Sequence, residues 1–272
     1  MKLVNYAQFA FDMNERGIAY AAAHSAALGF EAVEYLDLDE ARPRTVEQAN
    51  EERRILRQNG LEVACYSMLV DLWGCDEAAV MEKLDYIAAL GTPLLHHTLL
   101  PQFARTADSP DFEQALARVL PRAAKIAARA EALGMSVIYE PQGLYFNGPL
   151  HIERFLKEMK ALGHNVGFCA DFGNPLFVDA DPVACAAHLL QSVRHVHIKD
   201  YTLGEREIPE LEGYWLENGK RLTVTPLGTG VVDVKGALAL LHDAGYDGTV
   251  ALEFLAGDAE MKRSIAYVKE NW

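Results

Sequence analysis

The feature that most constrains the fold of this chain is a short apolar run, rich in β-branched residues, that recurs along its whole length. The runs cover residues 3–9, 31–36, 61–68, 93–99, 135–140, 166–171, 193–199 and 248–254. Each precedes a segment with helical periodicity. Strands that alternate with helices favour parallel pairing and right-handed crossovers. Eight such units in 272 residues predict a closed (β/α)8 TIM barrel.

Glycines mark the ends of the predicted helices. A glycine just after a helix can adopt the left-handed conformation that stops it. Such a residue precedes six of the predicted strands, at Gly29, Gly60, Gly91, Gly134, Gly163 and Gly245. The clearest helix begins at Asp111 and ends at Leu133. No linker interrupts the pattern, so we expect residues 1–272 to form a single barrel domain. An open doubly wound sheet is the alternative, although no GxGxxG motif follows the first strand.

The charge balance narrows the range of partners. The chain carries 25 Lys and Arg against 39 Asp and Glu, a net charge of −14, which repels nucleic acid and anionic membranes. The four cysteines show no CxxC spacing, which favours a reducing compartment. Asn5, Gln8 and Asp12 break the apolar stretch at the start, so we expect no signal peptide and no membrane span. These features favour a cytoplasmic protein with a small-molecule partner rather than nucleic acid or a membrane; a homo-oligomer remains open.

Polar residues close the last four predicted strands. Side chains alternate along a strand, so polar and bulky apolar residues can be assigned to opposite faces. In the fifth strand, for example, Val137 and Tyr139 lie on one face and Glu140 on the other. We expect the polar set to point into the barrel at its carboxyl end, where barrel enzymes hold their active sites. Three carboxylates meet this condition, Glu140, Asp171 and Glu253, and they are joined by a histidine of the seventh strand, His195 or His197.

Three carboxylates and a histidine in one place predict a metal site. Without a cation the carboxylates would repel one another, whereas a divalent ion satisfies all of them. The ligand set is hard, and it suits one Mn²⁺, the first expectation, or Mg²⁺ or Co²⁺, with Zn²⁺ also possible. Glu253 is the strongest single candidate, because an unpaired charge in its apolar strand would cost several kcal/mol.

Several further residues are candidates for substrate binding. His195 shares the inward face with His197, and one of the two could be a packed histidine. Lys199 could contact a substrate oxygen or pair with Asp171 or Asp200. A long segment, residues 201–232, follows the seventh strand on the active-site face, and we expect it to cover the substrate.

Other candidates lie earlier in the chain. His96 and His97 are adjacent, so only one of them can face the barrel. Glu34 ends the second strand with inward parity, where a substrate contact and a salt bridge across the barrel are equally open. Asn174 could donate a hydrogen bond to a substrate hydroxyl.

These strand ends resemble the sugar phosphate isomerase/epimerase family of xylose isomerase-like barrels. That family includes ketose 3-epimerases, hydroxypyruvate isomerase and inosose dehydratase, and endonuclease IV is related to it. The resemblance spans nearly the whole chain. The matching segments are LGFEAVE (28–34), VIYEP (137–141), the strand end at Asp171, HVHIKD (195–200), PLGTGVVD (226–233) and GYDGTVALE (245–253).

The resemblance implies roles for the same strand-end residues. The family's metal ligands fall on Glu140, Asp171, His197 and Glu253, and its acid/base pair on Glu140 and Glu253, which lie on opposite sides of the substrate carbon. It implies an isomerase or epimerase that moves a proton next to the carbonyl of a ketose, a ketose phosphate or a small hydroxy-keto acid.

Two departures from the family pattern leave the substrate open. Asn174 stands where members often have a histidine, and Thr229 stands where they often have a glutamate. An inosose-type dehydratase is therefore the main alternative. An endonuclease IV-type nuclease is disfavoured by Asn174 and by the net charge, because it needs a histidine-rich cluster of several metals. A noncatalytic metal or sugar binder is the last alternative.

Overall fold

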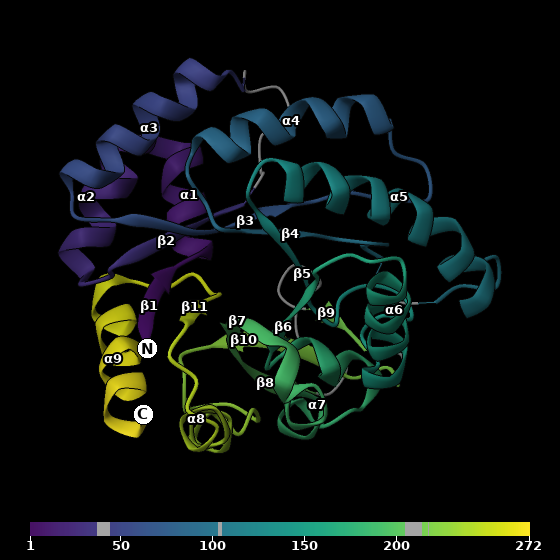
Figure 1. The fold of residues 1–272 in the computed structure, drawn as a ribbon. Helices are drawn as coiled ribbons and strands as arrows, with labels where there is room; N and C mark the ends of the chain where they lie inside the picture. The colour runs from purple at the N-terminus through teal and green to yellow at the C-terminus, as the bar shows by residue number, and fades with distance from the viewer. Residues whose placement is uncertain (37–43, 103–104, 205–213, 217) are drawn as a thin grey trace.

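The computed structural model describes residues 1–36, 44–102, 105–204, 214–216 and 218–272 (Figure 1). Within these residues, eight parallel strands close into a barrel in the order β1-β11-β7-β6-β5-β4-β3-β2. The strands are β1 (Lys2–Asn5), β2 (Ala32–Leu36), β3 (Glu62–Met68), β4 (Leu94–His97), β5 (Ser136–Tyr139), β6 (Gly167–Asp171), β7 (Val193–Ile198) and β11 (Thr249–Leu252). The predicted (β/α)8 barrel is confirmed.

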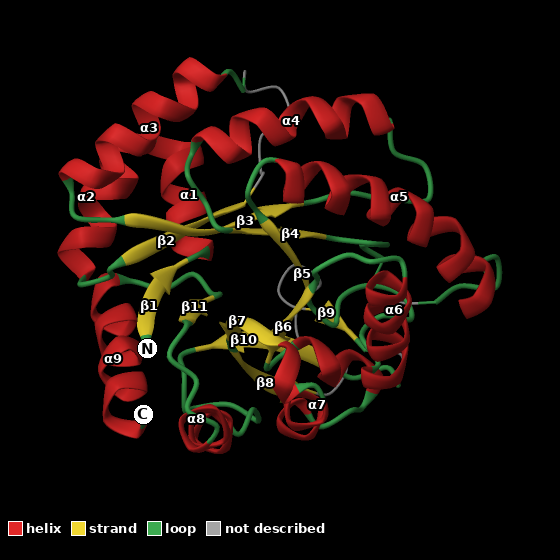
Figure 2. Cartoon of the chain, viewed as in Figure 1, coloured by secondary structure: helices red, strands yellow, loops and turns green. Residues whose placement is uncertain are grey.

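Helices surround the barrel on its outside (Figure 2). They are α1 (Ala7–Arg16), α2 (Ile18–Leu28), α3 (Val46–Gln58), α4 (Glu77–Ala89), α5 (Phe112–Ala132), α6 (Pro149–Ala161), α7 (Pro182–His188), α8 (Val234–Asp243) and α9 (Asp258–Asn271), with 3₁₀ turns η1 (Asn174–Val178) and η2 (Leu190–Ser192). All six glycines predicted to stop helices have φ between 70° and 93°. None of the helices in the described ranges is long and apolar enough to cross a membrane.

The alternation predicted along the strands is confirmed. Val137 and Tyr139 pack in the main core between strands and helices, together with the outward residues of β7 and β11. Small inward residues fill the barrel itself, where Ile138 packs against Cys65 and Cys169. The polar residues at the ends of β5, β6, β7 and β11 therefore lie above this small core, at the carboxyl end of the barrel.

The first strand is shorter than predicted. It ends at Asn5 rather than at residue 9, and α1 begins at Ala7. The Asn5 side chain accepts a hydrogen bond from the Phe9 backbone N–H at 3.2 Å. A side-chain acceptor at this point competes with strand pairing and favours a helix start. Tyr6 therefore stands at the carboxyl end of β1, beside the other strand ends.

The long segment after β7 contains a small sheet of its own. β8 (Asp200–Gly204), β10 (Arg221–Thr225) and β9 (Tyr214–Trp215) pair antiparallel in that order. Residues 205–213 and 217 of the predicted covering loop lie outside the described residues. The segment returns onto Asp200, whose carboxylate accepts hydrogen bonds from the backbone of Gly228, Gly230 and Val232 at 2.8–3.0 Å. The turn at 226–233 is thus fixed to the first residue of β8.

Candidate metal centre

Three carboxylates and one imidazole converge at the carboxyl end of the barrel. One ligand atom from each of Glu140, Asp171, His197 and Glu253 lies within 4.8 Å of all the others. His197 Nδ1 lies 2.8 Å from Glu140 Oε2, 3.4 Å from Glu253 Oε2 and 3.9 Å from Asp171 Oδ2. Glu253 has 22% of its side chain exposed, whereas the other three have 2% or less. The cluster is therefore buried with one open side, at Glu253.

Backbone hydrogen bonds between neighbouring strands place these four residues in one layer of the barrel. Glu253 follows β11 directly, and its N–H donates to the carbonyl of Ile198 in β7 at 3.0 Å. Phe172, next to Asp171, donates to the carbonyl of His197 at 3.1 Å. Parallel ladders of this kind bring successive strand ends to one layer. The local sequence thus supplies the carboxylates, and the closed sheet places them together.

The two carboxylate oxygens of Asp171 have different partners. Its Oδ1 accepts hydrogen bonds from the N–H groups of Gly173 and Asn174 at 2.8 and 2.5 Å. Its Oδ2 is buried and forms an ion pair with the Lys199 ammonium, whose Nζ lies 2.9 Å away. A buried acceptor of this kind is costly unless a cation or donor reaches it. Three carboxylates and an imidazole that converge here form a hard donor set, which fits a divalent cation.

Lys199 already places a positive charge between two of the carboxylates. Its Nζ donates to Glu253 Oε2 at 2.8 Å and lies 2.9 Å from Asp171 Oδ2, and only 4% of its side chain is exposed. Burial lowers the pKa of Lys199, but Asp171 and Glu253 outweigh it, and the pKa lies well above its ordinary value. The ammonium is therefore charged, and it neutralises part of the cluster in the protein without metal.

Glu34 lies beneath the cluster and contacts the lower side of His197. Its oxygens lie 3.1 Å from His197 Nε2 and 2.8 Å from His195 Nε2, and one accepts from the Ser67 hydroxyl at 2.6 Å. A carboxylate behind a histidine fixes which ring nitrogen faces the metal. Here it leaves Nδ1 of His197 facing the carboxylates. His195 also forms a hydrogen bond with Thr249 Oγ1 at 2.6 Å. Glu34 and His195 are therefore both enclosed below the site.

The structure separates the adjacent histidines His96 and His97. His96 faces the cluster, with Nε2 3.6 Å from Glu140 Oε1 and Nδ1 2.9 Å from Ser67 Oγ. His97 turns to the outer face, where Nδ1 lies 3.0 Å from the Thr98 carbonyl and Nε2 lies 3.1 Å from the Tyr139 hydroxyl. Both ring nitrogens of His97 are occupied away from the cluster. Of the pair, only His96 lies where a substrate could reach it.

Asn174 is buried beside the cluster with an unused donor. Its backbone N–H holds Asp171, and its side-chain Nδ2 has no hydrogen-bond partner among the described residues. A buried amide hydrogen without a partner is a free-energy cost that a ligand oxygen would remove. This position is therefore suited to bind a hydroxyl or carbonyl.

Sequence reasoning missed Tyr6 and Cys169. The ring of Tyr6 stacks on His197 at 4.9 Å between centroids and 29° between planes, and it is buried. The position of Tyr6 at a strand end could have identified it, but the first strand was predicted to extend to residue 9, so Tyr6 was not recognised as lying at its end. Cys169 lies in the inward row below Asp171 and is one of the groups close to Glu140 and His197. Burial raises the pKa of the Cys169 thiol to about 12, so it remains protonated there.

The two glutamates that flank His197 have opposite pKa displacements. Burial raises the pKa of Glu140, but His96 and His197 outweigh it and the pKa lies at about 2. Burial raises the pKa of Glu253 to about 8, against the opposing effect of Lys199. Carboxylates whose environments separate their pKa values in this way are typical of acid and base pairs. The site therefore has the groups to take up a proton and to return it.

Known proteins share this architecture. The sequence model of the family described as xylose isomerase-like TIM barrels matches residues 22–271. No curated protein matches the chain by sequence. Among solved structures, D-allulose 3-epimerase from Methylomonas sp. is 18% identical with a TM-score of 0.75, and the alignment covers 100% of this chain and 98% of that one.

Two further solved structures are similar over 99% of both chains. The probable 3-DHS dehydratase AsbF from Bacillus anthracis is 20% identical with a TM-score of 0.74. The 3-keto-D-glucoside 4-epimerase YcjR from E. coli is 16% identical with a TM-score of 0.72. At these identities the likeness shows a shared fold, which serves several reactions.

Proposed function

The chain belongs to the xylose isomerase-like TIM barrel family, and we propose that it is a metal-dependent isomerase or epimerase. Its substrate would be a ketose, a ketose phosphate or a small hydroxy-keto acid, and residues 1–272 would act as one catalytic domain. The observation that carries the proposal is the convergence of Glu140, Asp171, His197 and Glu253 within 4.8 Å at the carboxyl end of the barrel. Two of the similar structures are sugar epimerases by name, which supports a sugar-like substrate.

The four converging residues would hold one divalent cation, with Mn²⁺ as the first candidate. When bound, it would supply Lewis acidity and stabilise negative charge that develops on a substrate oxygen during proton removal. Glu34 would keep Nδ1 of His197 directed at this ion through its contact with Nε2, 3.1 Å away. The Asp171 carboxylate is oriented for the same role by two backbone N–H groups.

Glu140 and Glu253 would move the proton. Each is a carboxylate in contact with His197, from β5 and β11. One would take the proton from the carbon next to the carbonyl, and the other would return it to the opposite face or to the neighbouring carbon. His96, Asn174 and Lys199 would bind substrate oxygens around them, because each presents a donor at the cluster.

Solvent isotope exchange tests this function directly. The protein, freed of metal and reloaded with Mn²⁺, is incubated in D₂O with a panel of ketoses and ketose phosphates. We expect deuterium at a carbon next to the carbonyl of at least one sugar, and loss of this exchange on chelation. A fully metallated protein that exchanges no carbon-bound proton with any member of the panel would contradict the proposal.

A dehydratase is the second candidate, and Lys199 is the observation that favours it. Its buried, charged ammonium lies beside Glu253 and would stabilise a departing hydroxyl by a hydrogen bond, while Glu140 removes the carbon-bound proton and protonated Glu253 supplies the proton that leaves with the hydroxyl as water. Mass spectrometry of the product separates the two reactions. A carbonyl product lighter by one water supports elimination, whereas a product of unchanged mass supports isomerisation or epimerisation.

A further inference from the structure

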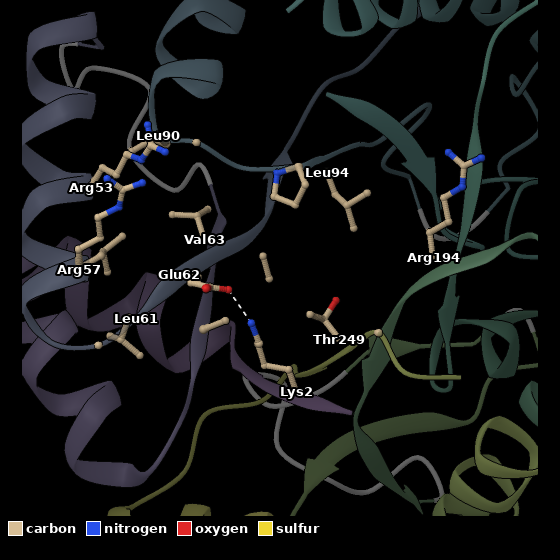
Figure 3. Close-up of a pocket in the computed structure, with 17 residues that line it drawn as sticks. Lys2, Arg53, Arg57, Leu61, Glu62, Val63, Leu90, Leu94, Arg194 and Thr249 are labelled. Carbon is tan, nitrogen blue, oxygen red and sulfur yellow. Dashed lines mark hydrogen bonds and ion pairs between the residues drawn. The ribbon is translucent and has the colours of Figure 1, made fainter. Parts of the chain in front are cut away.

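A cavity of about 800 Å³ opens at the amino-terminal face of the barrel, away from the metal centre (Figure 3). Its lining includes the first residues of β1, β3, β4 and β11, namely Lys2, Glu62, Leu94 and Thr249. The carboxylate cluster lies at the other ends of the strands. The volume falls within the range of small-molecule sites. We propose that this cavity is a second ligand site, for an organic anion with an apolar body and a negative group at each end.

The sign of the charge at the cavity opposes that of the whole protein. Lys2, Arg53, Arg57 and Arg194 line it, against the single carboxylate of Glu62. Lys2 and Glu62 pair at 2.5 Å, so the net positive charge comes from the three arginines. The chain as a whole carries −14. A concave positive region in an acidic protein concentrates anions locally.

Two of the arginines stand one helical turn apart with unused donors. Arg53 and Arg57 project from α3 to the same side of the cavity (Figure 3), and the side chain of neither forms a hydrogen bond or ion pair with any described residue. Arg54, between them, differs, because it donates to Glu51 at 2.7 and 2.6 Å. The guanidinium of Arg53 lies over Gly91, where an added Cβ would come within 2.6 Å of its Cζ. Arg53, whose guanidinium rests over Gly91, and Arg57 therefore form one edge of the cavity with N–H groups available to bind an anion.

Arg194 provides the opposite edge. It lies across the cavity from Arg53 and Arg57 (Figure 3), and its guanidinium donates to the carbonyl and side-chain oxygens of Asn165 at 3.0 and 2.5 Å. These bonds fix its orientation and leave further N–H groups of the fork available. Burial lowers the pKa of Arg194, although its guanidinium remains charged.

The wall between the two edges is largely apolar. It is formed by side chains that include Leu56, Leu61, Val63, Ala64, Pro93 and Leu94. An inorganic anion would leave this surface in contact with water, whereas a ligand with an apolar body would cover it and gain hydrophobic free energy. Cationic groups at both edges and an apolar surface between them therefore favour an amphiphilic dianion.

Fluorescence titration with bis-ANS, an aromatic disulfonate with an apolar body, tests the site. We expect one molecule to bind per chain, and the double variant Arg53→Ala/Arg57→Ala to weaken this binding by about tenfold or more, because two charge-assisted contacts are lost. Arg54→Ala is the matched control on the same helix and should leave binding within about twofold. Circular dichroism melts establish that all variants fold.

Competition with smaller ligands tests the requirement for two charges. Octanedioate, with a carboxylate at each end of an apolar chain, should displace bis-ANS at a lower concentration than octanoate does, and this difference should disappear in the double variant. Equal displacement by the two acids, or equal bis-ANS binding by the wild type and the double variant, would overturn the proposal. If Arg54→Ala weakened bis-ANS binding as much as the double variant does, the proposal would also be overturned, because the loss would then reflect only general attraction to positive charge.

Discussion

The two ends of the barrel are built from the same strands, yet they hold opposite kinds of chemistry. At the carboxyl end, carboxylates and histidines are packed with little exposure around His197. At the amino end, arginines line an open cavity of about 800 Å³. Only four positions separate Thr249 at one end of β11 from Glu253 at the other. The net charge of −14 therefore says little about the charge at any one site.

A chain of hydrogen bonds connects these ends through the middle of the barrel. Thr249 lines the amino-terminal cavity and its Oγ1 lies 2.6 Å from His195 Nδ1. His195 contacts Glu34 at 2.8 Å, and Glu34 contacts Nε2 of His197 at 3.1 Å. The polar residues below the carboxylate cluster are thus satisfied by one another. The difference between the ends lies in the groups that each offers to a ligand: carboxylates and an imidazole at the carboxyl end, and guanidinium donors at the amino end.

The largest expected effect comes from a carboxylate at the upper end. Glu253→Gln keeps the shape of the side chain but removes the proposed proton acceptor and metal ligand, and we expect kcat/KM for ketose exchange to fall by about 10³-fold. The same substitution at the lower end, Glu62→Gln, should change it by less than about twofold. Deuterium exchange rates measure both. A comparable loss in the two variants would remove the functional distinction between the ends.

A lysine at each end allows a comparison of stability. Lys199→Met leaves Asp171 and Glu253 without their buried cation, and we expect the free energy of unfolding without metal to fall by about 3 kcal/mol. Lys2→Met removes an exposed pair, with 39% and 69% of the two side chains accessible, and should cost less than about 1 kcal/mol. Urea unfolding in the presence of a chelator measures these values.

The same lysine variant carries a second readout. Because Lys199 occupies the carboxylates that would bind the ion, Lys199→Met should bind Mn²⁺ more tightly than the wild type, by calorimetric titration. Weaker binding in the variant would show that the ammonium supports the metal instead of competing with it.

A smaller effect is expected from the layer between the two ends. Glu34→Gln removes the charge behind His197, and we expect Mn²⁺ affinity to fall by about 10- to 100-fold while the fold is retained. Glu31→Gln, an exposed position three residues earlier, is the matched control and should leave the affinity unchanged. Calorimetry that shows no loss in Glu34→Gln would mean that Glu34 has only a packing role.

Periodicity was enough to predict the barrel and the inward rows of its strands, because alternation along a strand is a local property. It failed at the first strand, where the Phe9 backbone N–H donates to the Asn5 side chain and a helix begins, and where Tyr6 stacks on His197. It could not choose between His96 and His97, because that choice depends on Tyr139 and Ser67 in neighbouring strands.

The sequence by itself determined which residues stand at the ends of the last four barrel strands and therefore which side chains could form a metal site. Only the tertiary structure decided that Lys199 lies between Asp171 and Glu253, that Glu34 lies beneath His197, and that arginines from α3 and β7 face each other across one cavity. Strand and helix patterns arise from neighbours along the chain. Contacts between segments far apart in sequence depend on the closure and register of the sheet, which no local pattern specifies.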